Sequence, residues 1–330
     1  MSKLNISFGT FAFEQYRGRS LQPVLDALKA EGITDIDTGE QYGSNEADLG
    51  ASAPTEQGFK ISTKNPGGWR PGVALKEVGP RFEAALARLK ATSVDLFQIH
   101  APDSTVAISE WMPSVQALYE QGKFRRFGIS NFKPEDVREL YNHCMTNGYV
   151  LPTVYQGTYN AISRVPEARL FPVLREYDIS FHSYSPIAGG FLARSRSEVE
   201  AGIEIESSRW ATGPGHDPWL TGLYRGLYVK PSMLQALEKW EQIAQSQGCP
   251  KAEVAYRWLY YHSALRPVEK GDFLVAGASK IEQISQTVDG LRRGPLKPEV
   301  VKAIDEVWKL VKDDAIVDNY AWTVSQMSNK

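Results

Sequence analysis

Short apolar segments alternate with segments of helical periodicity along nearly the whole 330-residue chain. This alternation is typical of an α/β fold in which helices connect parallel strands. Eight such units in a chain of this length predict one (β/α)8 TIM barrel, with residues 1–330 forming a single domain. The eight predicted strands lie at residues 6–10, 34–38, 59–64, 94–100, 126–130, 153–156, 179–185 and 273–277.

Helical patterns lie between the predicted strands, and two regions differ from the regular repeat. The pattern at 297–311 follows the eighth strand and predicts an extra C-terminal helix. The connection from Ile187 to about Pro231 is long and rich in Gly, Pro and aromatic residues. Long connections in compact domains are usually lids or binding loops, and otherwise disordered, so we predict a long lid loop after strand 7. The other helices are predicted at 21–30, 80–89, 113–120, 134–144, 167–177, 232–246 and 251–261.

Nearly every predicted strand ends in a polar or Gly-rich cluster. In a (β/α)8 barrel these C-terminal strand ends and the loops after them form the active site. A doubly wound sheet would instead carry a Gly-rich phosphate turn, and the chain contains neither GxGxxG nor GxxxxGK[ST]. The clusters comprise Asp37, Lys64, His100, Ser130, Asn131, Gln156, Tyr184, Ser185, Gly277, Ala278 and Ser279.

Composition argues against several classes of partner. A formal net charge of −2 gives no electrostatic reason to bind nucleic acid or an anionic membrane. The two cysteines, Cys144 and Cys249, are far apart and follow no metal-binding or redox spacing, which suits a reducing compartment. The sequence shows neither a signal peptide nor an apolar run of about 18 residues. We therefore expect no membrane association and a cytoplasmic location.

Residues 35–43, DIDTGEQYG, place a carboxylate at a strand end and a tyrosine five residues later in a Gly-flanked turn. Tyrosine is a poor acid, with a reference pKa of about 10, and needs a neighbouring cation to donate a proton near neutral pH. Lys64 ends the next predicted strand and would supply that cation beside Tyr42. Asp37 would pair with the ammonium, and His100, at the end of the fourth strand, would hydrogen-bond a substrate carbonyl. Each residue alone also fits an ordinary role, such as a solvated lysine, an Asx turn or a buried histidine; their joint placement favours the chemical role.

These residues fall in motifs that resemble the aldo-keto reductase superfamily, and the similarity covers almost the whole chain. Within it, residues 147–157 and 292–296 look like the subgroup of aflatoxin-aldehyde and succinic-semialdehyde reductases. The superfamily motifs lie at 35–50, 93–103, 122–132 and 183–190.

The resemblance implies a catalytic tetrad of Asp37, Tyr42, Lys64 and His100. It also implies a nicotinamide cofactor that delivers hydride to a carbonyl carbon while Tyr42 protonates the oxygen, giving an alcohol. The residues implied to bind the cofactor are Ser130, Asn131 and Gln156 at the carboxamide, Tyr184 against the nicotinamide ring, Ser185, Pro186, Ile187, Ala188 and Gly189 along the pyrophosphate, and Gly277, Ala278, Ser279, Lys280, Gln283, Gln286 and Thr287 around the adenosine phosphate.

Ser279 and Lys280 offer a hydroxyl and an ammonium where a 2′-phosphate would lie, which favours NADPH over NADH. Alternatively, Lys280 is a solvated charge at the start of a helix. Two neighbouring positions depart from the pattern of the superfamily: Gln283 stands where many members carry Arg, and Thr287 where an Asn commonly contacts the adenine.

The C-terminal tail also departs from the subgroup, which ends in Asn-Tyr-Phe-Arg, whereas this chain reads Asn-Tyr-Ala-Trp at 319–322 and continues to Lys330. A terminal Arg would suit a substrate carboxylate. Trp322 in its place predicts a more apolar pocket and a hydrophobic or aromatic carbonyl substrate, in detoxification or secondary metabolism. The predicted substrate-binding residues are Phe11, Trp69, Trp210, Arg225 and Trp322.

Two other functions stay open at this point. A cofactor-binding regulatory protein of the same fold, with little turnover, would keep NADPH without relying on catalysis. A metal-dependent barrel hydrolase is the other, but the chain shows no His pair or His/carboxylate cluster at ligand spacing, so no metal is expected. A homodimer is implied by the subgroup alone.

Overall fold

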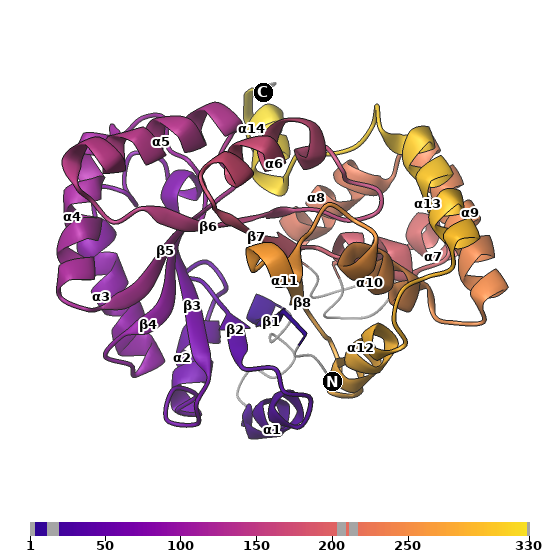
Figure 1. Cartoon of the computed structure of the whole chain (residues 1–330), viewed down its shortest axis with the longest axis horizontal. Coiled ribbons are helices and arrows are strands. Elements are labelled where there is room, and N and C mark those ends of the chain that lie inside the picture. The colour runs from indigo at the N-terminus through magenta and orange to yellow at the C-terminus, as the bar shows by residue number, and fades with distance from the viewer. Residues whose placement is uncertain (1–3, 12–19, 203–208, 211–216, 329–330) are drawn as a thin grey trace. The chain divides into compact units, whose positions relative to one another are not determined.

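The computed structural model describes residues 4–11, 20–202, 209–210 and 217–328. Eight strands close into a barrel in sequence order, and the neighbouring pairs from β8 through β1 to β6 are parallel (Figure 1). This confirms the predicted fold class and all eight strands, with small shifts at their ends. The strands are β1 (Ile6–Gly9), β2 (Asp35–Asp37), β3 (Lys60–Asn65), β4 (Val94–Ile99), β5 (Phe124–Ser130), β6 (Pro152–Thr158), β7 (Ser180–Tyr184) and β8 (Phe273–Ala276).

Helices follow the strands, and all of those expected from periodicity are present. They are α1 (Gln22–Ala30), α2 (Asn45–Ala51), α3 (Val78–Leu89), α4 (Ile108–Glu120), α5 (Pro134–Asn147), α6 (Pro166–Glu176), α7 (Arg196–Ala201), α8 (Pro218–Tyr228), α9 (Pro231–Gln247), α10 (Lys251–Tyr261), α11 (Pro267–Lys270), α12 (Glu282–Arg292), α13 (Pro298–Val311) and α14 (Asn319–Ser328), with the 3-10 turns η2 (Gly67–Trp69) and η3 (Ala188–Ala193). In the part of the chain that the structure describes, no helix is both long and apolar enough to cross a membrane.

The connection after β7 contains more regular structure than a lid loop would. Its described residues include η3, α7 and α8, and the helix starts have ordinary local causes. Ser195 caps α7 by accepting from the Glu198 amide, and Asp217 caps α8 ahead of Pro218. Residues 203–208 and 211–216 of the predicted lid lie outside the described residues, and a lid role stays a prediction.

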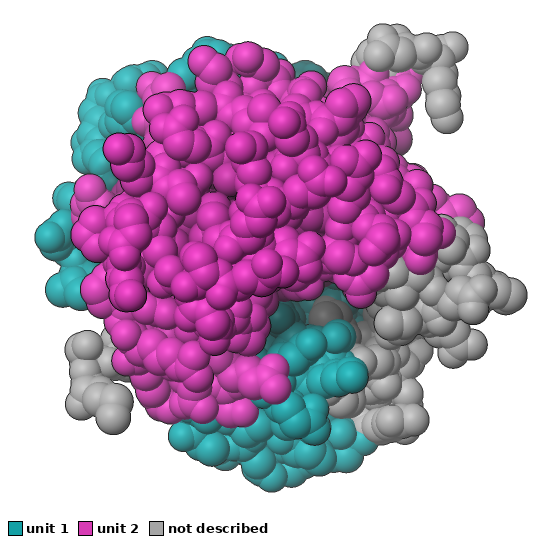
Figure 2. All heavy atoms as spheres, turned by 90° about the vertical axis from the view of Figure 1, so that its right-hand side faces the viewer, with its two compact units in different colours: residues 1–157, 169–182, 268–284 teal, residues 158–168, 183–267, 285–330 magenta. Residues whose placement is uncertain are grey.

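The chain divides into two compact units, teal and magenta in Figure 2. Unit 1 comprises Met1–Gly157, Arg169–His182 and Val268–Ile284, and unit 2 comprises Thr158–Ala168, Ser183–Pro267 and Ser285–Lys330. Unit 1 holds β1–β5 and β8 entirely and most of β6 and β7. Its residues therefore supply nearly all of the barrel wall.

Alternation along the strands separates an aromatic outer layer from a polar interior in unit 1. On β4, Phe97 packs against Phe82 of α3 at a ring separation of 4.2 Å and against Phe124 of β5 at 5.5 Å. The side chain of the next residue, Gln98, points to the opposite face of the strand and is fully buried. The register pairs it with Lys64 of β3. The barrel interior near the strand ends is therefore built from polar side chains whose outer neighbours supply the apolar packing.

Candidate active site

Lys64 and Asp37 form a buried ion pair inside the barrel. Lys64 Nζ lies 2.6 Å from Asp37 Oδ2 and donates to the Thr38 carbonyl at 2.8 Å. Both side chains are nearly inaccessible to water, with relative exposures of 1% for Lys64 and 3% for Asp37. Burial acts to lower the pKa of Lys64, but the charge of Asp37 and the Tyr42 phenol outweigh it and raise that pKa above its ordinary value. Lys64 therefore stays protonated at neutral pH.

Tyr42 lies beside that cation, in the turn between β2 and α2. Lys64 Nζ is 5.1 Å from the centroid of the Tyr42 ring. The Tyr42 amide donates to the Gly39 carbonyl, and the Glu40 amide donates to the carbonyl of Lys64 itself. The side chain of Asn45 donates to the Thr10 carbonyl at 2.8 Å. The turn that carries the phenol is thus tied to the strand that carries the ammonium.

The far side of the turn is fixed by α2 and α3. Glu46 of α2 is buried, accepts from the Thr63 hydroxyl and pairs with Arg88 of α3 at 2.7 Å. A Cβ on Gly50 would come within 2.2 Å of the Arg88 carbonyl, so α2 can lie this close to α3 only with glycine there. Arg81 of α3 also pairs with Glu40 at 2.6 Å. The turn that carries Tyr42 is therefore fixed on both sides, at Glu40 and at α2.

His100 follows β4 and lies edge-on to Tyr42, with ring centroids 5.7 Å apart. Burial and the nearby Lys64 charge keep the pKa of His100 well below its usual value, so its imidazole is neutral at neutral pH. Among the described residues, its Nδ1 has no hydrogen-bond partner. A neutral imidazole beside the phenol can donate a hydrogen bond to a carbonyl oxygen.

Two of the predicted substrate-binding residues lie against these rings. Phe11 is 5.1 Å from Tyr42, and Trp69 is 6.1 Å from His100, both in edge geometry. Trp69 ends η2, where Gly67 has a positive φ of 56° and a Cβ would lie 2.1 Å from the Ala101 carbonyl oxygen. The close approach that glycine allows brings Trp69 next to His100, so unit 1 flanks the tetrad with apolar rings.

Ser130, Asn131 and Gln156 lie at the ends of β5 and β6. Asn131 adopts a left-handed backbone with a φ of 63°, and its amide donates to the carbonyl of His100 at 2.9 Å. Gln156 donates to Asp37 Oδ1 at 2.9 Å. Sequence reasoning assigned Gln156 to the cofactor alone and missed this bond, because the inward neighbours of a strand residue depend on the register around the barrel.

The segment predicted to meet the adenosine phosphate begins after β8 with Gly277 and Ala278. The side-chain Oε1 of Gln283 accepts from the backbone N–H and the hydroxyl of Ser279, at 2.8 and 3.2 Å, and from the backbone N–H of Lys280 at 3.2 Å. Three donors that converge on one oxygen are also the arrangement that a phosphate oxygen requires. The other predicted residues, Gln286 and Thr287, lie on α12 and belong to unit 2.

Unit 2 carries Tyr184 and the predicted pyrophosphate segment. Burial and the nearby Asp318 charge hold the pKa of Tyr184 well above its usual value, so the phenol stays neutral. Ser185 and Ala188 have positive φ values of 56° and 52°, followed by Gly189 at 65°. Non-glycine residues in this conformation cost about 1–3 kcal/mol each and cluster at ligand sites. Pro186 and Ile187 lie between them.

The remaining predicted substrate residues also lie in unit 2, where each has a packing role. Trp210 is 1% exposed, and its indole N–H donates to the Gly189 carbonyl at 3.1 Å. Arg225 donates to the Val199 carbonyl at 3.0 Å. Trp322 lies on α14, and a Cβ on Gly226 would come within 2.2 Å of its ring. Direct substrate contacts of these three residues stay predictions.

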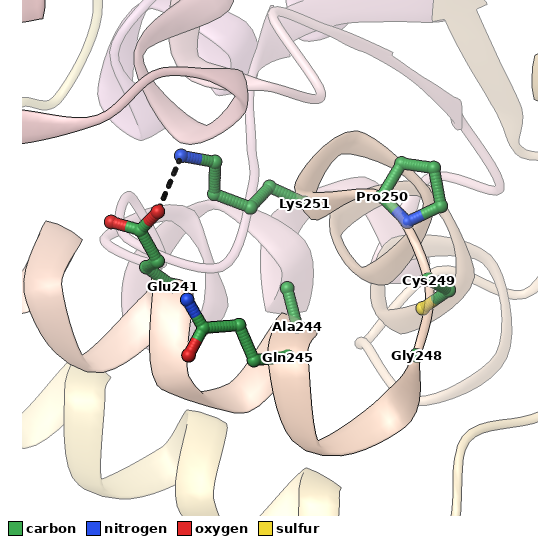
Figure 3. Close-up of a pocket in the computed structure, with 7 residues that line it drawn as sticks. All are labelled: Glu241, Ala244, Gln245, Gly248, Cys249, Pro250 and Lys251. Atoms are coloured by element: carbon green, nitrogen blue, oxygen red, sulfur yellow. Dashed lines mark ion pairs between the residues drawn. The ribbon is translucent and has the colours of Figure 1, made fainter.

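A separate hollow on unit 2 lies where α9 ends and α10 begins (Figure 3). Its charged groups are Glu241 and Lys251, 3.6 Å apart. Burial and the nearby Glu253 charge raise the pKa of its one thiol, Cys249, and keep it protonated. The hollow therefore offers no activated nucleophile. Its lining is Glu241, Ala244, Gln245, Gly248, Cys249, Pro250 and Lys251. Nor do the described residues gather three His, Cys, Asp or Glu side chains that could hold a metal.

We expect His182 of β7 to make the stability of the barrel depend on pH. It is 4% exposed, and burial together with the Arg126 charge lowers its pKa to about 3. An unfolded histidine titrates near about 6.5, so between these values the unfolded chain binds the extra proton and stability falls as pH falls. Replacing His182 by Leu is expected to reduce the loss of unfolding free energy between about pH 7.5 and pH 5 by about 2 kcal/mol. Urea unfolding at the two pH values measures this, and an equal loss in both proteins would contradict it.

The closed barrel brings together a carboxylate, an ammonium and an imidazole at or next to its strand ends and a phenol from the turn after β2. In (β/α)8 enzymes this face of the barrel carries the active site. The chain belongs to the aldo/keto reductase family, whose profile matches residues 5–309. It is therefore an oxidoreductase of a family that reduces carbonyl compounds and uses nicotinamide cofactors.

Relatives cover most of the chain. Oxidoreductase sirO of Leptosphaeria maculans is 33% identical over 323 residues, which cover 94% of this chain and 95% of the relative. Aflatoxin B1 aldehyde reductase member 2 of Homo sapiens is 36% identical over 298 residues, covering 86% and 80% respectively. Aldo-keto reductase pigE of Monascus ruber is 31% identical over 314 residues, covering 92% and 90%. The resemblance to the aflatoxin-aldehyde reductase subgroup is confirmed.

Proposed function

We propose that this chain reduces an aldehyde or ketone to an alcohol with NADPH and that Tyr42 donates the proton. The observation that carries the proposal is the buried Lys64 ammonium, 2.6 Å from Asp37 and 5.1 Å from the centroid of the Tyr42 ring. A bound nicotinamide cofactor supplies the hydride that adds to the carbonyl carbon.

Each residue of the tetrad has a distinct task. The Tyr42 hydroxyl gives its proton to the substrate oxygen as negative charge develops there, and the Lys64 cation stabilises the phenolate that remains. Asp37 keeps the ammonium oriented. The neutral His100 donates a hydrogen bond to the same substrate oxygen. The carbonyl gains one hydride and one proton, and the proton returns to Tyr42 from solvent.

The residues predicted to hold the cofactor fit such a group. In unit 1, Ser130, Asn131 and Gln156 present hydroxyl and amide groups of the kind that pair with a carboxamide. In unit 2, the ring of Tyr184 suits a nicotinamide face, and the left-handed residues Ser185, Ala188 and Gly189 suit a pyrophosphate. These assignments rest on the family motif together with the donor chemistry of each segment.

The donors around Gln283 support the proposed preference for NADPH, which can be tested at Lys280. Lys280→Ala is expected to weaken NADPH binding by about tenfold, because a charge-assisted hydrogen bond to phosphate is lost, while NADH binding changes little. Titration of the quenching of tryptophan fluorescence measures both affinities. Lys297→Ala, at the start of α13, removes an exposed lysine elsewhere and serves as the control. Equal weakening of the two cofactors by Lys280→Ala would contradict the NADPH assignment.

We further propose a hydrophobic or aromatic carbonyl substrate, in detoxification or secondary metabolism. The rings of Phe11 and Trp69 beside the tetrad support it, as does the similarity to the human aflatoxin B1 aldehyde reductase. A clear preference for carboxylate-bearing aldehydes would contradict this part. We also predict that residues 1–330 form one reductase domain, that the chain works in the cytoplasm and that it forms a homodimer.

A further inference from the structure

Gln98 is a polar residue of the barrel interior that lies among the tetrad but has no role in it so far. It is fully buried, and its backbone pairs with Lys64 on one side and Gly128 on the other. Its Nε2 donates to the Ser62 hydroxyl at 2.7 Å and lies 3.5 Å from Asp37 Oδ1. Its amide therefore lies beside the Asp37–Lys64 pair.

The amide of Gln98 is energetically unfavourable as packing. Its Oε1 is buried without a hydrogen-bond partner among the described residues, and a buried acceptor left unpaired destabilises a fold. A leucine or methionine would fill a similar volume with no such penalty. A residue that breaks a packing rule in the middle of an active site is better explained by the site than by the core.

The surroundings of Gln98 are arranged around it. A Cβ on Gly128 would lie 3.1 Å from Gln98 Cγ and 3.0 Å from the Val154 carbonyl oxygen. Glycine at 128 thus leaves the room that the glutamine side chain occupies. Ser62 orients the amide from the opposite side, which directs the second N–H toward Asp37.

The carboxylate of Asp37 uses both oxygens. Oδ2 pairs with Lys64, while Oδ1 accepts from Gln156 at 2.9 Å and faces Gln98 at 3.5 Å. If the proposed function holds, Gln156 also serves the carboxamide of the cofactor, and its bond to Asp37 weakens or is shared. No cofactor contact is assigned to Gln98, so its amide stays available to Asp37.

We propose that Gln98 is a positioning residue for catalysis: its amide holds Asp37 Oδ1 so that Oδ2 stays on Lys64 while Gln156 engages the cofactor. The inference rests on the proposed function for its effect on turnover. Its effect on the Asp37–Lys64–Tyr42 cluster does not depend on turnover.

The test is Gln98→Leu, with Gln98→Met as a second variant of similar length if the leucine protein does not fold. kcat is expected to fall by about threefold to tenfold, with little change in KM, because one donor to Asp37 is lost. The high-pH limb of the kcat profile should move to lower pH by roughly 0.5 unit, since the coupled Lys64 and Tyr42 protons are held less firmly. The thermal midpoint should stay equal or rise, because the unpaired acceptor is gone. A merely structural role would lower the midpoint and leave the pH limb in place, which would overturn the proposal.

Ser62→Ala should give a smaller change of the same kind and add nothing in the Gln98→Leu background, because both act through one amide. Gln57→Leu removes a hydrogen-bonded glutamine away from the barrel interior and should leave kcat and the pH limb unchanged. Additive effects of Ser62→Ala and Gln98→Leu on kcat would contradict the proposal that both residues act through the Gln98 amide.

A second readout separates this proposal from the proposed function. Absorbance of tyrosinate follows the ionisation of the tyrosines, and the contribution of Tyr42 is the part that Tyr42→Phe removes. In Gln98→Leu this contribution should shift to lower pH, whether or not the protein turns over. Absence of turnover in the wild type would end the reductase proposal, while the titration still decides on Gln98. An unshifted titration would overturn the role of Gln98 even in an active enzyme.

Discussion

Tyr42→Phe is expected to lower kcat for carbonyl reduction by about 10²–10⁴-fold, the usual contribution of a positioned proton donor. The variant keeps the ring that packs edge-on against Phe11 and His100 and loses only the hydroxyl. NADPH binding should stay within about twofold of wild type, since no cofactor contact is assigned to that hydroxyl. Steady-state kinetics and a fluorescence titration measure the two quantities separately.

Tyr119→Phe is the matched control for this variant. It removes a phenol hydroxyl from a tyrosine on α4 that is 41% exposed. Its kcat should equal that of wild type. Retention of more than about a tenth of the turnover by Tyr42→Phe would show that another group donates the proton.

Asp37→Asn is expected to lower the free energy of unfolding by about 3–5 kcal/mol, because Lys64 is left as a buried cation without its counter-ion. The two side chains are of nearly equal size, so packing around residue 37 changes little. After the change, the ammonium keeps its hydrogen bond to the Thr38 carbonyl but loses the neighbouring negative charge. Urea unfolding at neutral pH measures the loss.

The double variant Asp37→Asn/Lys64→Met should recover most of that stability, since it removes the unpaired charge as well. Glu306→Gln breaks the exposed pair with Lys309 on α13 and should leave stability unchanged, because solvent screens it. No recovery in the double variant would mean that Asp37 stabilises the barrel by contacts other than the ion pair.

The strands, and the polar residues near their ends, could be predicted from sequence because their signals are local. An apolar run followed by Asp37, Lys64 or His100 indicates both a strand and a polar end, and barrel geometry gathers those ends on one face. The predicted helices did not include α2, α7, α8, α11, α12 or the C-terminal α14. α2 has seven residues and is fixed mainly by Glu46 and Gly50 through contacts with β3 and α3, which no local periodicity contains.

The bonds among interior side chains could not be predicted. Gln98 and Gln156 converge on Asp37 only because the barrel closes and sets the register of three distant strands. In the same way, the aromatic character of Trp210 and Trp322 suggested a pocket, while their packing on Gly189 and Gly226 depends on where α8 and α14 lie within unit 2. The type of each residue indicated which chemistry it could take part in, but its actual contacts depended on the tertiary structure.

The most direct test of the central claim is the oxidation of NADPH by the wild-type protein with a panel of aldehydes and ketones, followed by absorbance and by detection of the alcohol product. The account predicts consumption of NADPH in step with alcohol formation, fastest with hydrophobic or aromatic carbonyls. NADPH that binds but is not consumed with any carbonyl would contradict it and would favour a cofactor-binding regulatory protein of the same fold.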